Sequence, residues 1–295
     1  MLLRSLLFMP GNNEKILSKI EKVDADAVIL DLEDGVPFSE KKQARRLVKE
    51  RLATINIDKL DKEVLVRING INDTDGTDYN LPQKDLKAVC TNSFDGLMIP
   101  KVNSPAEFQQ LEKLLDDLKA AENFPGAEEL YFIPNIETAR GVINVNSLLG
   151  ASENLQGAAL GGEDLALDLG ARRTKAGDEL SYARSRMLLA CRAQNRLAID
   201  VVFTDIQDEV GLKEEAKKAS NLGYDGKLAI HPQQLGPINE AFTPSEEEIK
   251  YARRVVEAFA EASKENKSVA VVDGEMIDPP VAARARRILD FQEKL

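Results

Sequence analysis

Ionisable side chains stand where the short apolar runs of this sequence end. An apolar run followed by turn residues is typical of a buried strand. One acid or base at the end of a strand means little, but a series of them that converges on one edge of a sheet or barrel indicates a catalytic or binding site. In chain order the groups are Asp31, Glu33, Asp34, Arg67, Lys101, Glu137, Glu163, Asp164 and His231.

The carboxylates in this series predict a metal site. A carboxylate in apolar surroundings is costly unless it is paired or bound to a cation. Oxygen ligands without a His or Cys cluster favour magnesium, with manganese as the alternative, over zinc. Glu137 and Asp164 follow consecutive apolar runs and are the predicted ligand pair. The alternative for each is a helix cap, but Thr138 is the better capping residue beside Glu137.

Two basic side chains of the series invite different interpretations. Arg67 lies inside the apolar run VLVRIN and requires an anionic partner, either a structural carboxylate or a substrate carboxylate. His231 is the one histidine of the chain and precedes Pro232. We interpret it as a positioned structural residue, and a single histidine leaves no credible Ser-His-Asp triad.

Eight apolar runs alternate with helical patterns, which predicts a parallel sheet covered on both faces. This number of units in about 240 residues favours an α/β fold of the (β/α)₈ TIM-barrel type, whose chemistry lies at the carboxyl ends of the strands. A doubly wound open sheet is the alternative, but no Gly-x-Gly-x-x-Gly turn follows the first run. The predicted strands are 5–9, 27–32, 63–68, 96–100, 130–136, 157–160, 198–203 and 227–230.

The last part of the chain does not belong to the barrel pattern. We expect a catalytic barrel domain over 1–242 and a C-terminal extension of helices and a lid segment over 243–295. The extension begins with a helix over 244–264, for which Thr243 is a plausible cap. A short β-like stretch and a final helix behind Asp278 follow. Extensions of this kind often serve as lids or oligomer contacts.

Composition narrows the class of protein. The net charge of −11 argues against a nucleic-acid partner, and no apolar run is long enough for a membrane span. The opening MLLRSLLFMP contains Arg4 and lacks a cleavage site, so it predicts a buried strand rather than a signal peptide. Cys90 and Cys191 are expected to be free buried thiols, as is typical of a cytoplasmic protein.

Several motifs in a fixed order resemble the citrate lyase β-subunit family, within the HpcH/HpaI aldolase superfamily and related to malyl-CoA and citramalyl-CoA lyases. The resemblance covers nearly the whole chain. The motifs are RSLLFMPGNN at 4–13, LDLEDGV at 30–36, VRING at 66–70, IPK at 99–101, IETARGV at 136–142, GGEDLALDLG at 161–170, GYDGKLAIHP at 223–232 and DGEMIDPP at 273–280.

The resemblance implies a magnesium-dependent barrel enzyme that forms a homo-oligomer, usually a trimer or hexamer. Its metal ligands map to Glu137 and Asp164, the pair chosen above. Arg67 matches a residue that contacts substrate and polarises the thioester carbonyl, and Asp278 matches an acid/base aspartate carried by the C-terminal lid. The remaining implied roles are support of metal-bound waters by Glu33 and Asp34, and coenzyme A binding by Arg4 and Lys15.

The predicted function is cleavage or formation of a carbon–carbon bond in a 3-hydroxyacyl-CoA thioester such as citramalyl-CoA, malyl-CoA or a citryl thioester. The products of cleavage are a 2-oxo acid and an acetyl-CoA enolate. His231 stands where β-subunits of citrate lyase complexes tend to have Asn, which favours a free-standing enzyme on acyl-CoA. Three alternatives remain: a class II aldolase on free oxo acids, a carrier-linked citrate lyase β subunit, and an inactive assembly subunit.

Overall fold

The computed structural model describes residues 2–71, 81–120 and 130–293. Its eight predicted strands form a closed parallel barrel in chain order, since β1 pairs with β8 as well as with β2. This closure confirms the predicted barrel and excludes the open sheet. The strands are β1 (Ser5–Pro10), β2 (Ala27–Asp31), β3 (Glu63–Arg67), β4 (Gly96–Ile99), β5 (Tyr131–Ile136), β6 (Gly157–Leu160), β7 (Leu197–Asp200) and β8 (Gly226–Ala229).

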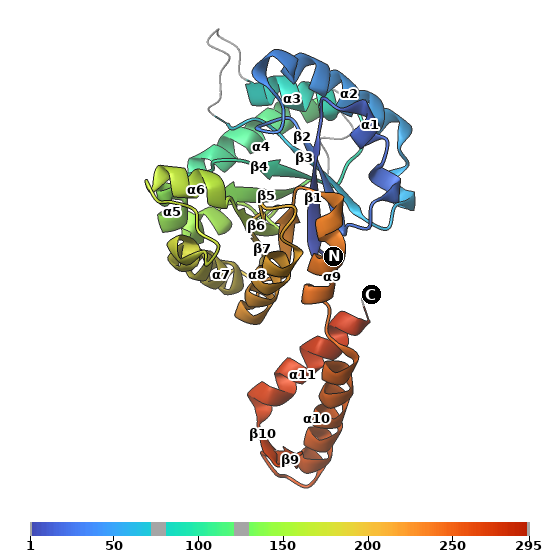
Figure 1. Cartoon of the computed structure of the whole chain (residues 1–295), viewed down its shortest axis with the longest axis vertical. Helices are drawn as coiled ribbons and strands as arrows, with labels where there is room; N and C mark the ends of the chain where they lie inside the picture. The colour runs from blue at the N-terminus through green and yellow to red at the C-terminus, as the bar shows by residue number, and fades with distance from the viewer. Residues whose placement is uncertain (1, 72–80, 121–129, 294–295) are drawn as a thin grey trace. The chain divides into compact units, whose positions relative to one another are not determined.

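Helices surround the strands (Figure 1) and bury their apolar faces against the outer side of the barrel. Thr138, for example, caps α5 by accepting a hydrogen bond from the Gly141 amide, 2.9 Å away. The helices of this part are α1 (Glu14–Leu17), α2 (Lys41–Thr54), α3 (Leu81–Val89), α4 (Pro105–Ala120), α5 (Ala139–Leu149), α6 (Gly162–Asp168), α7 (Ser181–Ala193), α8 (Glu209–Leu222) and α9 (Leu235–Phe242).

A layer of apolar side chains fills the barrel interior. It includes Ile29 of β2, Leu65 of β3, Ile133 of β5 and Ala159 of β6. Because side chains alternate along a strand, the residues two positions further toward the carboxyl ends share this inward face. These positions hold Asp31, Arg67, Asn135 and Gly161. The apolar layer therefore forms the floor on which a polar site is built.

The connection after β1 is not one continuous helix, because it consists of α1 and a separate 3₁₀ turn at Ile20–Lys22. Among the described residues, no helix combines the length and apolar character that a membrane crossing needs. Cys90 and Cys191 are free and buried, as expected.

The C-terminal residues form a compact unit of their own, Glu240–Leu295 together with the first two residues, while Leu3–Asn239 form the other. The unit contains α10 (Glu246–Lys264), the antiparallel pair β9 (Ala270–Val272) and β10 (Glu275–Ile277), and α11 (Pro279–Gln292). Its small core includes Val255 and Ile277. The cap of α10 is Ser245, with Glu248 completing a capping box, rather than the expected Thr243.

Candidate active site

Arg67 is held by two carboxylates at the carboxyl end of the barrel. Its Nε and Nη2 donate to the two Asp31 oxygens at 2.7 and 2.6 Å, and its Nη1 lies 3.0 Å from Glu33 Oε2. The guanidinium also lies over the Phe8 ring, 4.5 Å from its centroid. The partner required by a buried arginine is thus a pair of structural carboxylates. Two of its five N–H groups, one on each Nη, are not used in these contacts.

Glu137 follows β5 directly and is 2% exposed. Its Oε2 accepts from the backbone N–H of Lys101 at 2.9 Å, and its Oε1 accepts from the side-chain amide of Asn135. Burial, followed by repulsion from Glu33, raises the pKa of Glu137 to about 8 although Arg67 lowers it. Since Thr138 caps α5, Glu137 is not the helix cap that the alternative interpretation required.

Asp164 lies in the first turn of α6, which begins just after β6. Its side chain makes no hydrogen bond or ion pair with another residue in the described part of the chain, and Gly161 precedes the helix without a side-chain cap. The negative charge of Asp164 contributes to the raised pKa of Glu137. Gly161 is required by this approach, because a Cβ there would lie 2.3 Å from Glu137 Cγ. The two predicted ligands therefore stand at the carboxyl ends of the adjacent strands β5 and β6.

The residues at this rim fit a divalent cation. Five acids face two bases: Asp31, Glu33, Asp34, Glu137 and Asp164 against Arg67 and Lys101. The Oδ1 of Asn135 is buried and has no hydrogen-bond partner in the described part of the chain, so a water or ligand donor beside Glu137 would satisfy it. No cluster of three or more His, Cys, Asp or Glu suited to a metal occurs among the described residues. A site with two protein carboxylates and water agrees with magnesium preferences.

Glu33 and Asp34 occupy the turn after β2. Both Glu33 oxygens are engaged, one by Arg67 and one by Lys101 Nζ at 2.6 Å, while Asp34 is more exposed and lies 3.4 Å from the same Nζ. Glu163 points to the surface and pairs with Arg173. Glu33 therefore belongs to the charged rim, and Asp34 lies at its edge.

Some predicted residues are not gathered at this rim. Arg4 precedes β1 and pairs with Asp26, which precedes β2, so it lies at the amino ends of the strands, the opposite end of the barrel. Coenzyme A binding by Arg4 stays a prediction. Lys15 is exposed on α1, which follows the carboxyl end of β1. His231 caps a 3₁₀ turn by accepting from the Gln233 amide, as expected of a structural residue.

Asp278 belongs to the C-terminal unit. There it caps α11, and its Oδ1 accepts from the backbone N–H of Val281 at 3.0 Å. Its Oδ2 makes no hydrogen bond or ion pair with another residue of the described ranges. Asp278 is therefore a helix cap, and this role uses only one of its two carboxylate oxygens.

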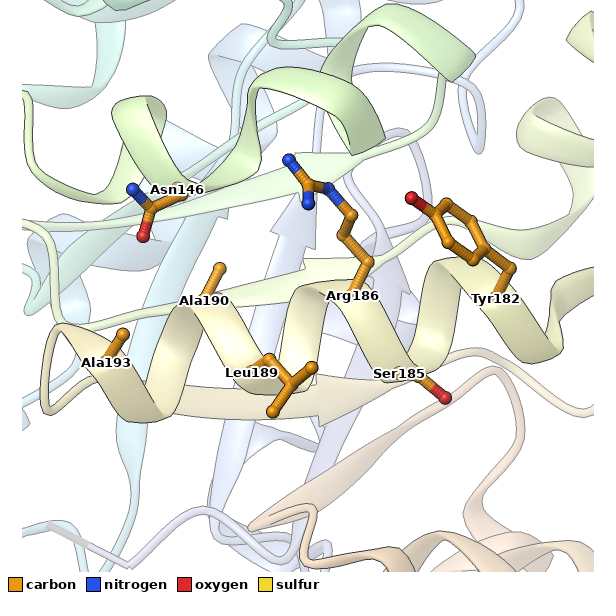
Figure 2. A pocket seen from close by; sticks show the side chains of 7 residues that line it. All are labelled: Asn146, Tyr182, Ser185, Arg186, Leu189, Ala190 and Ala193. Atoms are coloured by element: carbon orange, nitrogen blue, oxygen red, sulfur yellow. The ribbon is translucent and has the colours of Figure 1, made fainter.

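A hollow of about 370 Å³ lies between α5 and α7 and is lined mainly by α7 side chains such as Tyr182, Arg186 and Leu189 (Figure 2). The Arg186 guanidinium is used on the backbone carbonyls of Val142 and Ile143. None of the strand-end acids lines this hollow. It is therefore a feature of the helical layer and not the candidate active site.

Sequence reasoning assigned no role to three residues that shape the site: Asp31, Lys101 and Asn135. Asp31 and Lys101 were recognised only as strand-end charges. Asn135 was missed, although it stands two residues before Glu137 in YFIPNIE and must share its face by strand alternation. A polar residue at an inward position of an apolar strand was the available signal.

Comparison with known proteins places this site in a family. The sequence model of the HpcH/HpaI aldolase/citrate lyase family matches residues 4–232. This chain belongs to that family. The predicted family is confirmed, and so is the predicted class of enzyme, a magnesium-dependent carbon–carbon lyase.

Members of the family resemble the chain over nearly its full length. Citrate lyase subunit beta of Leuconostoc mesenteroides subsp. cremoris is 36% identical, covering 97% of this chain and 92% of the relative. A (3S)-malyl-CoA thioesterase of Cereibacter sphaeroides is 35% identical, covering 99% and 95%. The crystal structure of protein CitE from Mycobacterium tuberculosis in complex with magnesium, acetoacetate and coenzyme A has a TM-score of 0.76 at 32% identity, covering 98% of this chain and 97% of that one.

Proposed function

We propose that this family member, a magnesium-dependent carbon–carbon lyase, cleaves or forms a 3-hydroxyacyl-CoA thioester such as citramalyl-CoA or malyl-CoA. The observation that carries the proposal is that Glu137 and Asp164 follow adjacent strands above an apolar barrel floor, beside a fixed Arg67. A related protein was crystallised with magnesium and coenzyme A, which supports the same cofactor and class of substrate here.

Glu137 and Asp164 are the residues that would hold the cation. Bound magnesium would act as a Lewis acid and a template for a carboxylate and its neighbouring oxygen. Asn135 and the Lys101 amide hold Glu137 from its two oxygens. This leaves further lone pairs on the Glu137 carboxylate for a ligand, because each carboxylate oxygen accepts more than one bond.

Arg67 supplies fixed positive charge for the oxygen that becomes negative. Cleavage passes the hydroxyl proton to water, turns the C–O bond into the carbonyl of the 2-oxo acid, breaks the adjacent carbon–carbon bond, and leaves its electron pair on the enolate of the acyl thioester. Because Asp31 and Glu33 fix the guanidinium before substrate arrives, no reorganisation is needed when the enolate oxygen forms. The unused N–H groups of Arg67 are the proposed donors to that oxygen.

Asp278 is the proposed proton carrier for the enolate carbon. Asp278→Asn preserves an oxygen that accepts from the Val281 amide, but the asparagine side chain cannot donate or take up a proton near neutral pH. We expect kcat to fall by roughly 100-fold or more, the usual size of a general acid/base contribution, with unchanged magnesium affinity of the substrate-free protein. An Asp278→Asn enzyme with full kcat would remove Asp278 from the mechanism.

The acyl group requires a direct test, because relatives of 36% and 35% identity carry different activities in their names. We would assay citramalyl-CoA, malyl-CoA, a carrier-linked citryl thioester and free 4-hydroxy-2-oxo acids, each with magnesium and with EDTA. The proposal expects EDTA-sensitive release of a 2-oxo acid from a CoA thioester. Turnover of free oxo acids alone would favour the class II aldolase, and activity only with a carrier thioester would favour a citrate lyase β subunit.

Two further expectations accompany this proposal. We propose a cytoplasmic enzyme that forms a homotrimer or homohexamer, as the family resemblance implies. Light scattering on the purified chain tests the assembly, and a monomer of 32.5 kDa would contradict it.

A further inference from the structure

Lys101 has a backbone conformation that a lysine rarely adopts. It lies two residues after the end of β4, and its φ of 54° lies in the left-handed region. Residues with a Cβ are disfavoured there unless surrounding contacts enforce the conformation, and such residues cluster at functional sites. The backbone contacts of Lys101 lie beside Glu137.

Both backbone polar groups of Lys101 are engaged beside the proposed metal ligand. The Lys101 N–H donates to Glu137 Oε2 at 2.9 Å, and the Lys101 carbonyl accepts from Asn103 Nδ2 at 2.7 Å. The Oδ1 of Asn103 in turn accepts from the hydroxyl of Thr138, the residue after Glu137. Because φ and ψ together set the angle between the N–H and the carbonyl of a residue, a change in φ would turn one of these groups away from its partner.

The turn that contains Lys101 packs closely on the helix behind Glu137. A Cβ on Gly141, in the first turn of α5, would lie 2.7 Å from the Val102 carbonyl oxygen. The Asn103 carbonyl also accepts from Asn144 Nδ2 at 2.9 Å. The turn after β4 is therefore held against the start of α5 by close packing and hydrogen bonds on both sides of Glu137.

We propose that Lys101 is a positioning residue for the metal site: its left-handed backbone aims the amide at Glu137 and orients that carboxylate for the cation. The inference rests on the proposed function, in which Glu137 is a metal ligand. The role belongs to the backbone of Lys101, whereas its ammonium separately pairs with Glu33.

Two substitutions at this position separate the backbone from the side chain. Lys101→Asn and Lys101→Val both remove the ammonium, but asparagine tolerates the left-handed region whereas a β-branched valine does not. We would measure the magnesium dissociation constant of the substrate-free protein by calorimetry, together with the thermal unfolding midpoint. Because misplacing a group that orients a ligand typically costs 10- to 100-fold in metal affinity, we expect Lys101→Val to bind roughly tenfold more weakly than Lys101→Asn.

The outcomes separate the two levels of the argument. Equal magnesium affinity of the Asn and Val variants would overturn the positioning role, because a merely structural role would lower the unfolding midpoint and leave the affinity of the folded protein unchanged. If Lys101→Val does not fold, Lys101→Ala replaces it, with an affinity expected below that of Lys101→Asn and equality again overturning the inference. A wild-type protein that binds no magnesium would instead contradict the proposed function itself.

Discussion

Arg67 and Asp31 face each other in register on neighbouring strands, and their side chains form a two-pronged ion pair with N–O distances of 2.7 and 2.6 Å. Parallel pairing places the two residues side by side at the last positions of β3 and β2. The fork geometry of the guanidinium matches both carboxylate oxygens. This pair sets the direction of the remaining Arg67 N–H groups.

Asp31→Asn should therefore impair both stability and catalysis. Among the described residues it leaves the buried guanidinium in contact with one carboxylate, that of Glu33, and breaking a buried pair costs about 3 kcal/mol in the free energy of unfolding. We expect kcat/KM to fall by roughly 100-fold as Arg67 moves. Urea unfolding and steady-state kinetics measure the two effects. Glu50→Gln is the control, since it breaks the exposed Arg46–Glu50 pair and should change stability by less than about 1 kcal/mol.

The raised pKa of Glu137 predicts a pH-dependent stability. In the folded, metal-free protein this pKa is about 8 rather than the ordinary 4.5, chiefly because of burial and Glu33. Between pH 4.5 and 8 the folded state holds a proton on Glu137 that the unfolded state releases. The contribution of this proton to the free energy of unfolding is therefore complete below pH 4.5 and is lost as pH rises through 8. The unfolding free energy of the wild type, relative to Glu137→Gln, should fall over this window. A difference that is flat from pH 5 to 8 would contradict the assignment.

The same group predicts how magnesium binding depends on pH. A metal ligand must be deprotonated, so the cation competes with the Glu137 proton. The magnesium affinity of the wild type should rise by about tenfold per pH unit up to pH 8 and then level off. Calorimetry at pH 6, 7, 8 and 9 measures this. An affinity independent of pH would argue that Glu137 is not a ligand.

Gly161→Ala tests the close approach of β6 to Glu137. Gly161 has a φ of −93°, which alanine adopts readily, but its new Cβ would lie 2.3 Å from Glu137 Cγ. Glu137 must then move, and we expect magnesium to bind at least tenfold more weakly. Gly236→Ala is the matched control, since nothing lies within 4 Å of its Cβ. Equal affinities in the two variants would show that the approach has no bearing on the metal site.

A second buried charge cluster should affect stability without affecting the site. Asp200 accepts from Arg184 at 2.7 Å and from Lys227 at 2.9 Å, and Glu215 completes the cluster. Asp200 and Lys227 alternate with the inward residues Ile199 and Leu228 and therefore face the helices. Asp200→Asn should lower the unfolding free energy by about 3 kcal/mol. Its folded form should keep wild-type magnesium affinity, and a loss there would refute this separation.

The barrel was predictable because its strands are short apolar runs of regular occurrence, and their ends place Glu137 and Asp164 on one rim. The helix α6 escaped prediction because it is seven residues long and opens with glycine, which gives little periodic signal. The Arg67–Asp31 pair depends on strand register, and the grip on Glu137 by Lys101 depends on a backbone torsion. Neither the register nor the torsion can be inferred from the types of the residues involved. The role of Asp278 came from the family resemblance alone and stays a prediction.

The central claim is that Glu137 and Asp164 bind one divalent cation between them. Anomalous diffraction from crystals of the wild-type protein grown with manganese, which substitutes for magnesium at such oxygen sites, locates that cation directly. We expect one strong peak within about 2.3 Å of a carboxylate oxygen of each residue, and its loss in Glu137→Gln crystals. A peak bound elsewhere, or no peak in protein that retains EDTA-sensitive turnover, would contradict the account.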